Sequence, residues 1–550
     1  MLKKVAAFTL ALVMLALCGC AAGDVENPDD TSSPKGTASP APASPTPAIP
    51  KDGGVLKLSV GPYDSINPLI TGNEDIRLYM STLVCETFVY IDENMVPKPG
   101  IFKSWTVDDS LTIWEFTIEQ GVKFHSGTPV EPVDVKNVID YIVGFGGNYA
   151  ESVENVTGCS VKDENTIQIL LKKPDALFVN KLAIPLVGWQ TLVTDQPTEI
   201  DGTGIFKVME ISSSRIYLAK HTLYRDQSKY THFDAVDISV FDSEDGKINS
   251  DFDFCLVQGT SVGTDLMDRD TYVYYYRGNS FDYIAINCTS SYVLASDTGS
   301  TVWGTDNYIS LDNPFSDKRM RQMLNLVTSR DALMRAAASD HGVLSLLPLY
   351  SGSVYRKQIS DGYDYSPDRA SSLLRDIGYE KTDEGWFKNG EEIVIRAICP
   401  KRNYRMLSAM RMVADSMRGI GLTVEVSELS DEEYLTKLRN KEFMIAAVET
   451  DLGTWQDCSA YFETAGRLNF SFYTNGKVDD YLKQIRTHSD PAVISAAYAK
   501  IEEIVLDECP IVGLFISDNA IVVRSRLKGV RDESLKPWAP LAAITEWWIE

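Results

Sequence analysis

The feature that most constrains the fold of this chain is the run from Asp108 to Val135, where the residue pattern changes from strand to turn to helix. Gly121 and Gly127 interrupt the pattern, and a helix is predicted to begin near Pro132. Apolar residues among threonines and aromatic residues predict a strand before these turns, and they are Leu111, Ile113, Phe116 and Ile118. The run therefore predicts a strand, a turn, a short strand and a helix, and this pattern alone indicates no function.

The same run resembles the signature segment of the family 5 extracellular solute-binding proteins, the peptide, dipeptide and nickel group. It departs from that signature at Ser126, which stands where the family has an acid, and at Pro132, which replaces a small residue. Both departures lie in a predicted surface turn or at a helix start. The residues that match are Trp114, Phe116, Gly121, Val122, Lys123, Phe124, His125, Gly127, Pro129, Val130, Asp134 and Val135.

Further segments resemble the family in the same order along residues 51–550. In one of them, Gly202-Thr-Gly-Ile-Phe206, we expect the glycines to permit positive φ angles. The resemblance implies an α/β, periplasmic-binding-protein-like fold with two lobes (type II, cluster C) and an extra small subdomain in the first lobe. The other matching segments are 63–69, 86–92, 313–333, 366–378, 407–426 and 469–482.

The resemblance and the composition together predict a division into domains. Two strand crossings between the lobes are expected near Leu311–Phe315 and Leu514–Asn519. The predicted parts are a lipoprotein signal peptide (1–20), a Pro/Ser/Thr-rich disordered linker (21–50), lobe 1 (51–312, with the small subdomain at about 94–200), lobe 2 (313–515) and a return to lobe 1 (516–550).

The N-terminus is typical of an exported bacterial lipoprotein. Lys3 and Lys4 precede an apolar run over 5–17, which is too short for an ordinary membrane-spanning helix. The following Leu-Cys-Gly-Cys resembles a lipobox in which Cys20 becomes the lipidated first residue, and acyl chains on it, palmitate among them, would hold the protein on the extracellular face of the cell membrane. A plain signal peptide cut near Ala22 is the alternative.

The composition argues against several classes of partner and cofactor. With 52 basic and 77 acidic residues the net charge is −25, which argues against nucleic acid and anionic lipid as partners. Only five histidines are present, and the seven cysteines after Cys20 form no C-x-x-C pair. We therefore expect no cofactor, no metal site and no disulfide framework.

The resemblance also suggests where a ligand would bind. Arg402 and Tyr404 resemble an R-x-Y sequence that meets a ligand carboxylate in dipeptide-binding members, although a solvated loop is an equal alternative. Thr454 stands where peptide binders have the acid that pairs with the ligand ammonium, so either Asp451 or Asp457 takes that amine or the ligand has none.

Three further residues complete the candidate site. Trp455 is predicted to be an aromatic platform for the ligand, with ordinary core packing as the alternative. Tyr63 and Cys85 are weaker candidates near the cleft.

The expected function is a monomeric, non-enzymatic receptor that passes oligopeptides or dipeptides to the permease and ATPase subunits of an ABC importer. The membrane is contacted through the lipid anchor only. An oligosaccharide or a nickel chelate is the alternative ligand, and a ligand sensor is an alternative role. A hydrolase is a weaker alternative, because Gly259-Thr-Ser-Val-Gly263 satisfies G-x-S-x-G with Ser261 as nucleophile.

Overall fold

The fold is known from a computed structural model that describes residues 50–193, 200–226, 231–257, 270–295, 308–356 and 364–550. The chain divides into two compact units, Met1–Ile49 and Pro50–Glu550. The second unit contains all the helices and strands given below.

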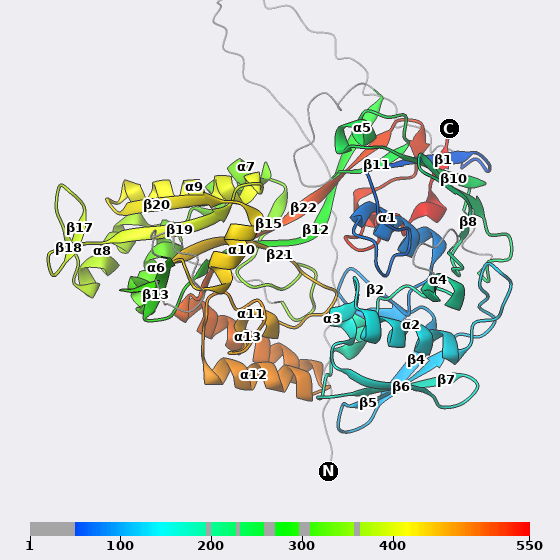
Figure 1. The fold of residues 1–550 in the computed structure, drawn as a ribbon, viewed down its shortest axis with the longest axis horizontal. Coiled ribbons are helices and arrows are strands. Elements are labelled where there is room, and N and C mark those ends of the chain that lie inside the picture. Colours follow the sequence, from blue (N-terminus) through cyan, green and yellow to red (C-terminus); the bar gives the residue numbers. More distant parts are fainter. Residues whose placement is uncertain (1–49, 194–199, 227–230, 258–269, 296–307, 357–363) are drawn as a thin grey trace, which may run out of the picture. The chain divides into compact units, whose positions relative to one another are not determined.

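One mixed sheet organises the second unit (Figure 1). Its parallel pairs are β1 with β10 and β11, and β19 with β20 and β21, and the other pairs are antiparallel. The strand order is β20 (Thr423–Leu429), β19 (Val394–Pro400), β21 (Ile445–Asp451), β12 (Thr271–Ile286), β22 (Ile511–Arg524), β11 (Phe254–Val257), β1 (Val55–Val60), β10 (Ala235–Val240), β9 (Arg215–Lys220) and β8 (Phe206–Ser212), with β15 (Gly342–Leu344) paired to β22.

Two long strands, β12 and β22, run side by side between the two lobes (Figure 1). Tyr276 of β12 belongs to the first hydrophobic core, whereas Phe281 belongs to another core. The first crossing expected near Leu311–Phe315 is therefore wrong, and the second, near Leu514–Asn519, lies within β22. A β-bulge between Arg277 and Phe281 lets β12 continue through the polar residues 277–280.

We call the elements around the first core, in residues 50–276 and 519–550, lobe 1, and those around the second and third cores, in residues 281–516, lobe 2. The helices of lobe 1 are α1 (Glu74–Tyr79), the π-helix η1 (Met80–Val84), α2 (Pro132–Phe145), α3 (Ala150–Val153), η2 (Phe178–Lys181), α4 (Trp189–Val193), α5 (Glu244–Ile248), η5 (Asp532–Ser534) and η6 (Ile544–Glu546).

The helices of lobe 2 pack on both faces of its part of the sheet. Ser366 and Gly378 flank one of them, with Gly378 in the left-handed conformation at its end. These helices are η4 (Pro314–Ser316), α6 (Lys318–Val327), α7 (Arg330–Ala338), α8 (Pro367–Ile377), α9 (Tyr404–Gly419), α10 (Asp431–Arg439), α11 (Ser459–Phe462), α12 (Gly476–Thr487) and α13 (Pro491–Glu508).

The signature run builds a separate four-stranded sheet with α2 beside it. Trp114 and Phe116 of β5 are buried, and Phe116 stacks on Phe102 with ring centroids 4.4 Å apart. The sheet order is β4 (Phe102–Val107), β5 (Ile113–Ile118), β7 (Thr166–Leu171) and β6 (Val156–Val161). Short sheets complete the fold: β2 (Val89–Ile91) with β3 (Pro97–Pro99), β13 (Ser291–Ala295) with β14 (Tyr308–Asp312), β16 (Glu380–Lys381) with β17 (Trp386–Lys388) and β18 (Glu391–Glu392), and β23 (Leu527–Lys528) with β24 (Trp548–Ile549).

The glycines at 202 and 204 are needed for a different reason from the one predicted. Neither has a positive φ. A Cβ on Gly202 would lie 2.0 Å from the carbonyl oxygen of Val84, and one on Gly204 would lie 2.5 Å from that of Leu83. Close approach of two backbones, not backbone conformation, requires glycine here.

Two observations concern the membrane and the thiols. None of the helices in the described part of the chain combines the length and the hydropathy that a membrane span requires. The seven cysteines after Cys20 are in the thiol form, and five of them are buried: Cys85, Cys255, Cys399, Cys458 and Cys509.

Candidate functional site

Polar residues gather where β12 and β21 pair beside the crossing between the lobes. Ser280 is paired with Asp451, and Asp282 with Glu449. Because alternate residues of a strand face the same side, these four side chains share one face of the sheet. Asp282 interrupts an otherwise apolar stretch, which marks it as a residue with a specific role.

Asp282 is fully buried and forms an ion pair with Arg405 in the first turn of α9, with Nε to Oδ2 at 2.8 Å. Arg405 also donates to Glu449. Burial raises the pKa of Asp282 to about 7, Arg405 opposes this shift, and the charge of Glu449 adds to it. The pair therefore fixes the start of α9 against the crossing strands, since a buried charge needs its partner.

Lobe 1 contributes charged groups from α1 and a tyrosine side chain from the residue before α3. Arg77 bonds to Glu74 at 3.0 Å and interacts with Tyr149 and, electrostatically, with Asp451 of lobe 2. Asp451 stays open to solvent, but neighbouring atoms remove part of its hydration. This desolvation and the charges of Glu74 and Glu449 raise the pKa of Asp451 to about 6.

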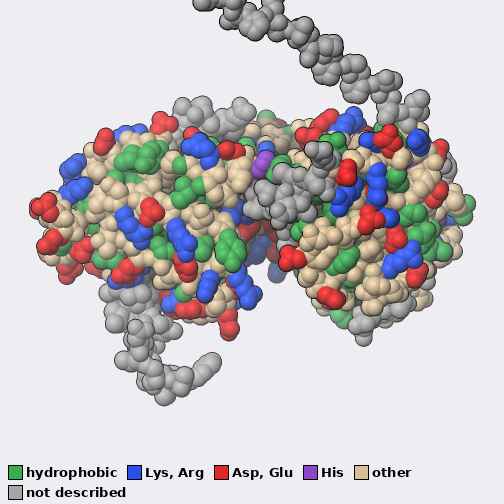
Figure 2. Space-filling model, turned by 90° about the horizontal axis from the view of Figure 1, so that it is seen from above, with side chains coloured by type: hydrophobic (Ala, Val, Ile, Leu, Met, Phe, Trp, Pro, Cys, Tyr) green, Lys and Arg blue, Asp and Glu red, His purple; other side chains and the backbone are tan. Residues whose placement is uncertain are grey.

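These residues form one charge cluster, which we define as Glu74, Arg77, Asp282, Arg405, Glu449 and Asp451. It contains four carboxylates and two guanidinium groups, so acid is in excess when all are ionised. In the space-filling view, the visible face is indented between the lobes, and charged side chains of both signs lie in the indentation (Figure 2). A site with excess acid, in which the pKa of one acid is raised by its neighbours, favours a cationic group on a ligand.

Arg402 and Tyr404 lie on the surface at the start of α9. The side chain of Arg402 is 88% exposed and is paired with Asp431 at 3.8 Å, and Tyr404 is 81% exposed. Their neighbours Asn403 and Arg405 instead contact Glu449. The R-x-Y residues thus border the charge cluster without belonging to it.

Thr454 is buried and contacts lobe 1 directly. Its hydroxyl donates to the carbonyl oxygen of Asn180 at 2.6 Å. An ionised carboxylate has no proton to donate to a carbonyl, so the acid that peptide binders have here would break this contact. Trp455 is half-buried, and its ring lies against Gly453, where a Cβ would be 2.5 Å from ring atoms.

Asp457, Tyr63 and Cys85 make contacts with residues outside the charge cluster. Asp457 accepts hydrogen bonds from the backbone and the hydroxyl of Ser459, at the start of α11. Tyr63 is half-buried against the first core, and Cys85 is buried within it. Among the two acids proposed for the ligand amine, Asp451 is the one that belongs to the charge cluster.

Sequence reasoning missed Asp282, Arg405, Glu74 and Arg77 as members of the site. The signal for Asp282 was an acid inside an apolar strand, and for Arg405 a second arginine beside the R-x-Y sequence. Glu74 and Arg77 carried no such signal, because charged residues three apart on a short helix are common on solvated surfaces.

Two histidines that are distant in sequence come together in lobe 1, although no clustering was expected. The rings of His125 and His221 lie 4.7 Å apart, and both contact the carbonyl oxygen of Gly204. Burial lowers the pKa of His125 to about 4, so this ring is neutral near pH 7, and burial also lowers the pKa of His221. Within the described ranges, no group of three or more His, Cys, Asp or Glu residues could hold a metal ion. Ser261 lies outside the described residues.

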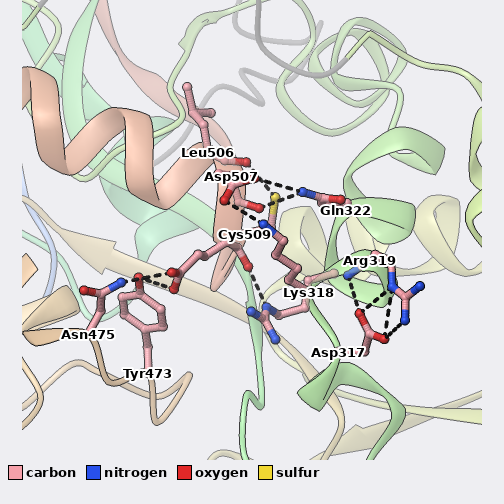
Figure 3. Close-up of polar contacts among 11 residues, drawn as sticks. Asp317, Lys318, Arg319, Gln322, Tyr473, Asn475, Leu506, Asp507 and Cys509 are labelled. Atoms are coloured by element: carbon pink, nitrogen blue, oxygen red, sulfur yellow. Dashed lines mark hydrogen bonds and ion pairs between the residues drawn. The ribbon is translucent and has the colours of Figure 1, made fainter. Parts of the chain in front are cut away.

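Lobe 2 has a separate open groove of about 790 Å³ between α12 and α13, and α6 lies beside α13. Figure 3 shows that its acids bind neighbouring elements: Asp507 pairs with Lys318 at 2.8 Å, and Glu508 accepts from Tyr473 at 2.6 Å and from Asn475 at 3.0 Å. These contacts tie the three helices together. The groove therefore has a structural explanation and is distinct from the charge cluster.

Comparison with known proteins points to a single protein family. Residues 96–469 match the model of the bacterial extracellular solute-binding proteins, family 5. The chain is similar to the oligopeptide-binding protein AppA of Bacillus subtilis, with 21% identity over 91% of this chain and 92% of AppA, and to the dipeptide-binding protein of Escherichia coli, with 22% identity over 78% and 83%.

The fold is similar to that of NikZ from Campylobacter jejuni in complex with Ni(L-His). The TM-score is 0.67 at 20% identity, over 91% of this chain and all of that one. The matched relatives are binding proteins rather than enzymes.

Proposed function

Because this chain belongs to the bacterial extracellular solute-binding proteins of family 5, we propose that it is the lipid-anchored receptor of an ABC importer that captures peptides with a free amino terminus. Family membership makes it a solute-binding protein of an ABC transporter and not an enzyme. The names of two similar proteins, an oligopeptide-binding and a dipeptide-binding protein, support a peptide ligand.

The observation that carries this proposal is the excess of acid in the charge cluster between the lobes. Asp451 takes the α-ammonium of the ligand, with Glu449 and Glu74 nearby. Arg77 is available for a ligand carbonyl or carboxylate. Arg402, Tyr404 and Trp455 border this site and contact the ligand side chains, while Tyr63 and Asp457 contribute only to its surroundings.

The proposed topology follows from the N-terminus. Cys20 carries the lipid anchor, residues 21–50 form the tether, and the binding unit stands outside the membrane as a monomer. The ligand-bound form docks on a permease whose ATPase subunit drives uptake. Binding energy that favours the closed arrangement of the lobes supplies the signal.

A nickel chelate is the second candidate ligand, because the similar NikZ holds nickel as Ni(L-His). Such a chelate also carries an amine, and the charge cluster would then contact the chelating amino acid. An oligosaccharide would need the acids only as hydrogen-bond acceptors, so the excess of acid favours it least.

The test measures binding to the full-length protein in detergent by isothermal titration calorimetry. A peptide with a free amino terminus and its N-acetylated form are titrated into the wild type and into Asp451→Asn. We expect acetylation to weaken binding to the wild type by about tenfold, ~1.4 kcal/mol, and to have little effect on Asp451→Asn. Asp415→Asn, an exposed acid on α9, is the matched control.

Equal binding of both peptide forms by the wild type would contradict the role of Asp451. Native mass spectrometry of the same protein, purified without denaturation, identifies the ligand that it retains. A sugar or a metal chelate in place of peptides would contradict the peptide assignment.

A further inference from the structure

A buried lysine and a buried aspartate join two short helices of lobe 1. Lys247 of α5 is completely buried, and its ammonium nitrogen lies 2.6 Å from Oδ2 of Asp75 in α1. Asp75 is also buried. Glu244, one turn earlier in α5, lies 2.8 Å from the same nitrogen and is half-exposed. Because lysine is almost never fully buried, this pair requires a physical explanation.

Stability alone does not explain the pair. Both charges lose their hydration on burial, and this loss offsets much of their attraction. Burial raises the pKa of Asp75 to about 6, although the charge of Lys247 opposes the shift. Apolar side chains of similar volume often stabilise a core equally well. What an ion pair adds is direction, since a charge-assisted hydrogen bond has a fixed geometry and apolar packing does not.

The direction matters because the other side of α1 carries two members of the charge cluster. Glu74 is exposed and Arg77 is partly buried, and they bond to each other at 3.0 Å. Asp75, between them in sequence, lies on the buried side of the helix. A rotation of α1 that separates Asp75 from Lys247 would therefore also turn Glu74 and Arg77 relative to Asp451.

The helix α1 is too short to keep this orientation by itself. It has six residues, and isolated helices of this length are unstable in water. It passes directly into the π-helix η1, whose last residues are held by the close approach of Gly202 and Gly204. At the other end, Asn73 caps the helix and Asp75 binds Lys247. The ion pair thus fixes the first turn of α1, where Glu74 lies.

Resting on the proposed function, we infer that Lys247 is a positioning residue for ligand binding, which acts through Asp75 to hold α1 so that Glu74 and Arg77 face Asp451. Lys247 itself touches no ligand, because it is completely buried. Its effect is on the carboxylate that takes the ligand ammonium, so it supports the preference for a free amino terminus.

The test replaces the ion pair by apolar side chains in the double variant Lys247→Met with Asp75→Val. Lys247→Met alone leaves a buried acid without its partner and is expected to lower stability, so it does not separate folding from positioning. The double variant removes both buried charges, and Glu244 stays solvated because it is half-exposed. We expect its thermal unfolding midpoint to stay close to that of the wild type.

Binding is measured by isothermal titration calorimetry on the full-length protein in detergent. The probes are a mixture of tripeptides with free amino termini and the same mixture after N-acetylation. The wild type should prefer the free form by about tenfold, and the double variant should prefer it by about threefold or less.

The pH dependence of binding is a second readout that a loss of stability would not move. Glu74 raises the pKa of Asp451 more than Arg77 lowers it, so turning α1 away lowers this pKa from its value of about 6. The rise of affinity with pH should therefore move to lower pH in the double variant. The charged and titratable groups around Asp451 are Glu74 and Arg77 of α1, Asp282 and Glu449 of the sheet, Arg405 of α9 and Tyr461 of α11.

Lys57→Met with Asp251→Val is the matched control, since it removes a more exposed ion pair of the same kind from lobe 1. It should keep the wild-type preference and pH dependence.

The outcomes separate this inference from the proposed function. A folded Lys247→Met, Asp75→Val variant with the preference and pH dependence of the wild type would overturn the inference and leave the proposed function intact. Failure of this variant to fold would make the pair a requirement for folding and would overturn the inference as well. Equal binding of both peptide forms by the wild type would contradict the proposed function, and this inference with it.

Discussion

Asp451 differs from the other acids of the site in being both open to solvent and shifted in pKa. Desolvation, Glu74 and Glu449 raise its pKa to about 6, and Arg77 and Arg405 oppose the shift. A ligand ammonium favours the ionised carboxylate, so binding lowers this pKa and releases a proton. Affinity for such a ligand must therefore rise with pH through about 6.

We predict binding of a free-amino peptide that is about tenfold weaker at pH 5 than at pH 7, since a group with a pKa near 6 is roughly one-tenth ionised at pH 5. Calorimetric titrations at pH 5, 6 and 7 check this. Asp451→Asn should show a much flatter profile. A wild-type affinity that stays constant over this range would count against an ionised Asp451 in the complex.

Arg405 has a partner that makes it far more important for stability than other arginines on the same helix. In Arg405→Met the fully buried Asp282 loses its ion pair, and we expect unfolding free energy to fall by ~3–5 kcal/mol. Arg411, also on α9, forms an exposed ion pair with Glu428 of β20. Arg411→Met breaks this pair and should lower the unfolding free energy by only ~0–1 kcal/mol. Urea unfolding followed by circular dichroism measures both, and equal losses would contradict the assigned role of Asp282.

Among the elements, residues 202–204, just before β8, approach the π-helix η1 so closely that no side chain fits at positions 202 and 204. Gly202→Ala would place a Cβ 2.0 Å from the Val84 carbonyl, so a backbone must move. We predict a loss of ~2 kcal/mol or more in unfolding free energy. Gly144→Ala, in α2 with open space around it, should instead raise stability by ~0.5–1 kcal/mol. Thermal unfolding of the two variants would show opposite shifts, and a neutral Gly202→Ala would exclude the close approach.

Most elements follow from local sequence patterns. The α8 helix between Ser366 and Gly378 has Pro367 in its first turn and Leu374 buried, which the apolar spacing predicts. Tertiary contacts extend other elements: β12 continues through polar residues because β22 pairs with it on both sides of the bulge.

For the whole molecule, the proposed attachment to the membrane rests on one residue of the N-terminal segment, Cys20. We predict that Cys20→Ser abolishes labelling by a fatty-acid analogue and releases the protein from the membrane fraction, because the acyl chains supply the anchoring energy. Cys18→Ser, two residues earlier, is the matched control and should stay anchored. Cell fractionation with immunoblotting reads both variants, and membrane retention of Cys20→Ser would refute the lipobox assignment.

The sequence alone determined the family and hence the two-lobed fold, because turn glycines, caps and the signature of residues 108–135 are local patterns that survive at about 21% identity to relatives. It also marked the loop 451–457 as a region of interest. Local patterns, however, do not specify which distant residues meet. Only the tertiary structure brought Glu74 and Arg77 to Asp451, selected Arg405 for Asp282, and placed Thr454 against Asn180, because these contacts join segments far apart in sequence and depend on how β12 and β22 join the two lobes.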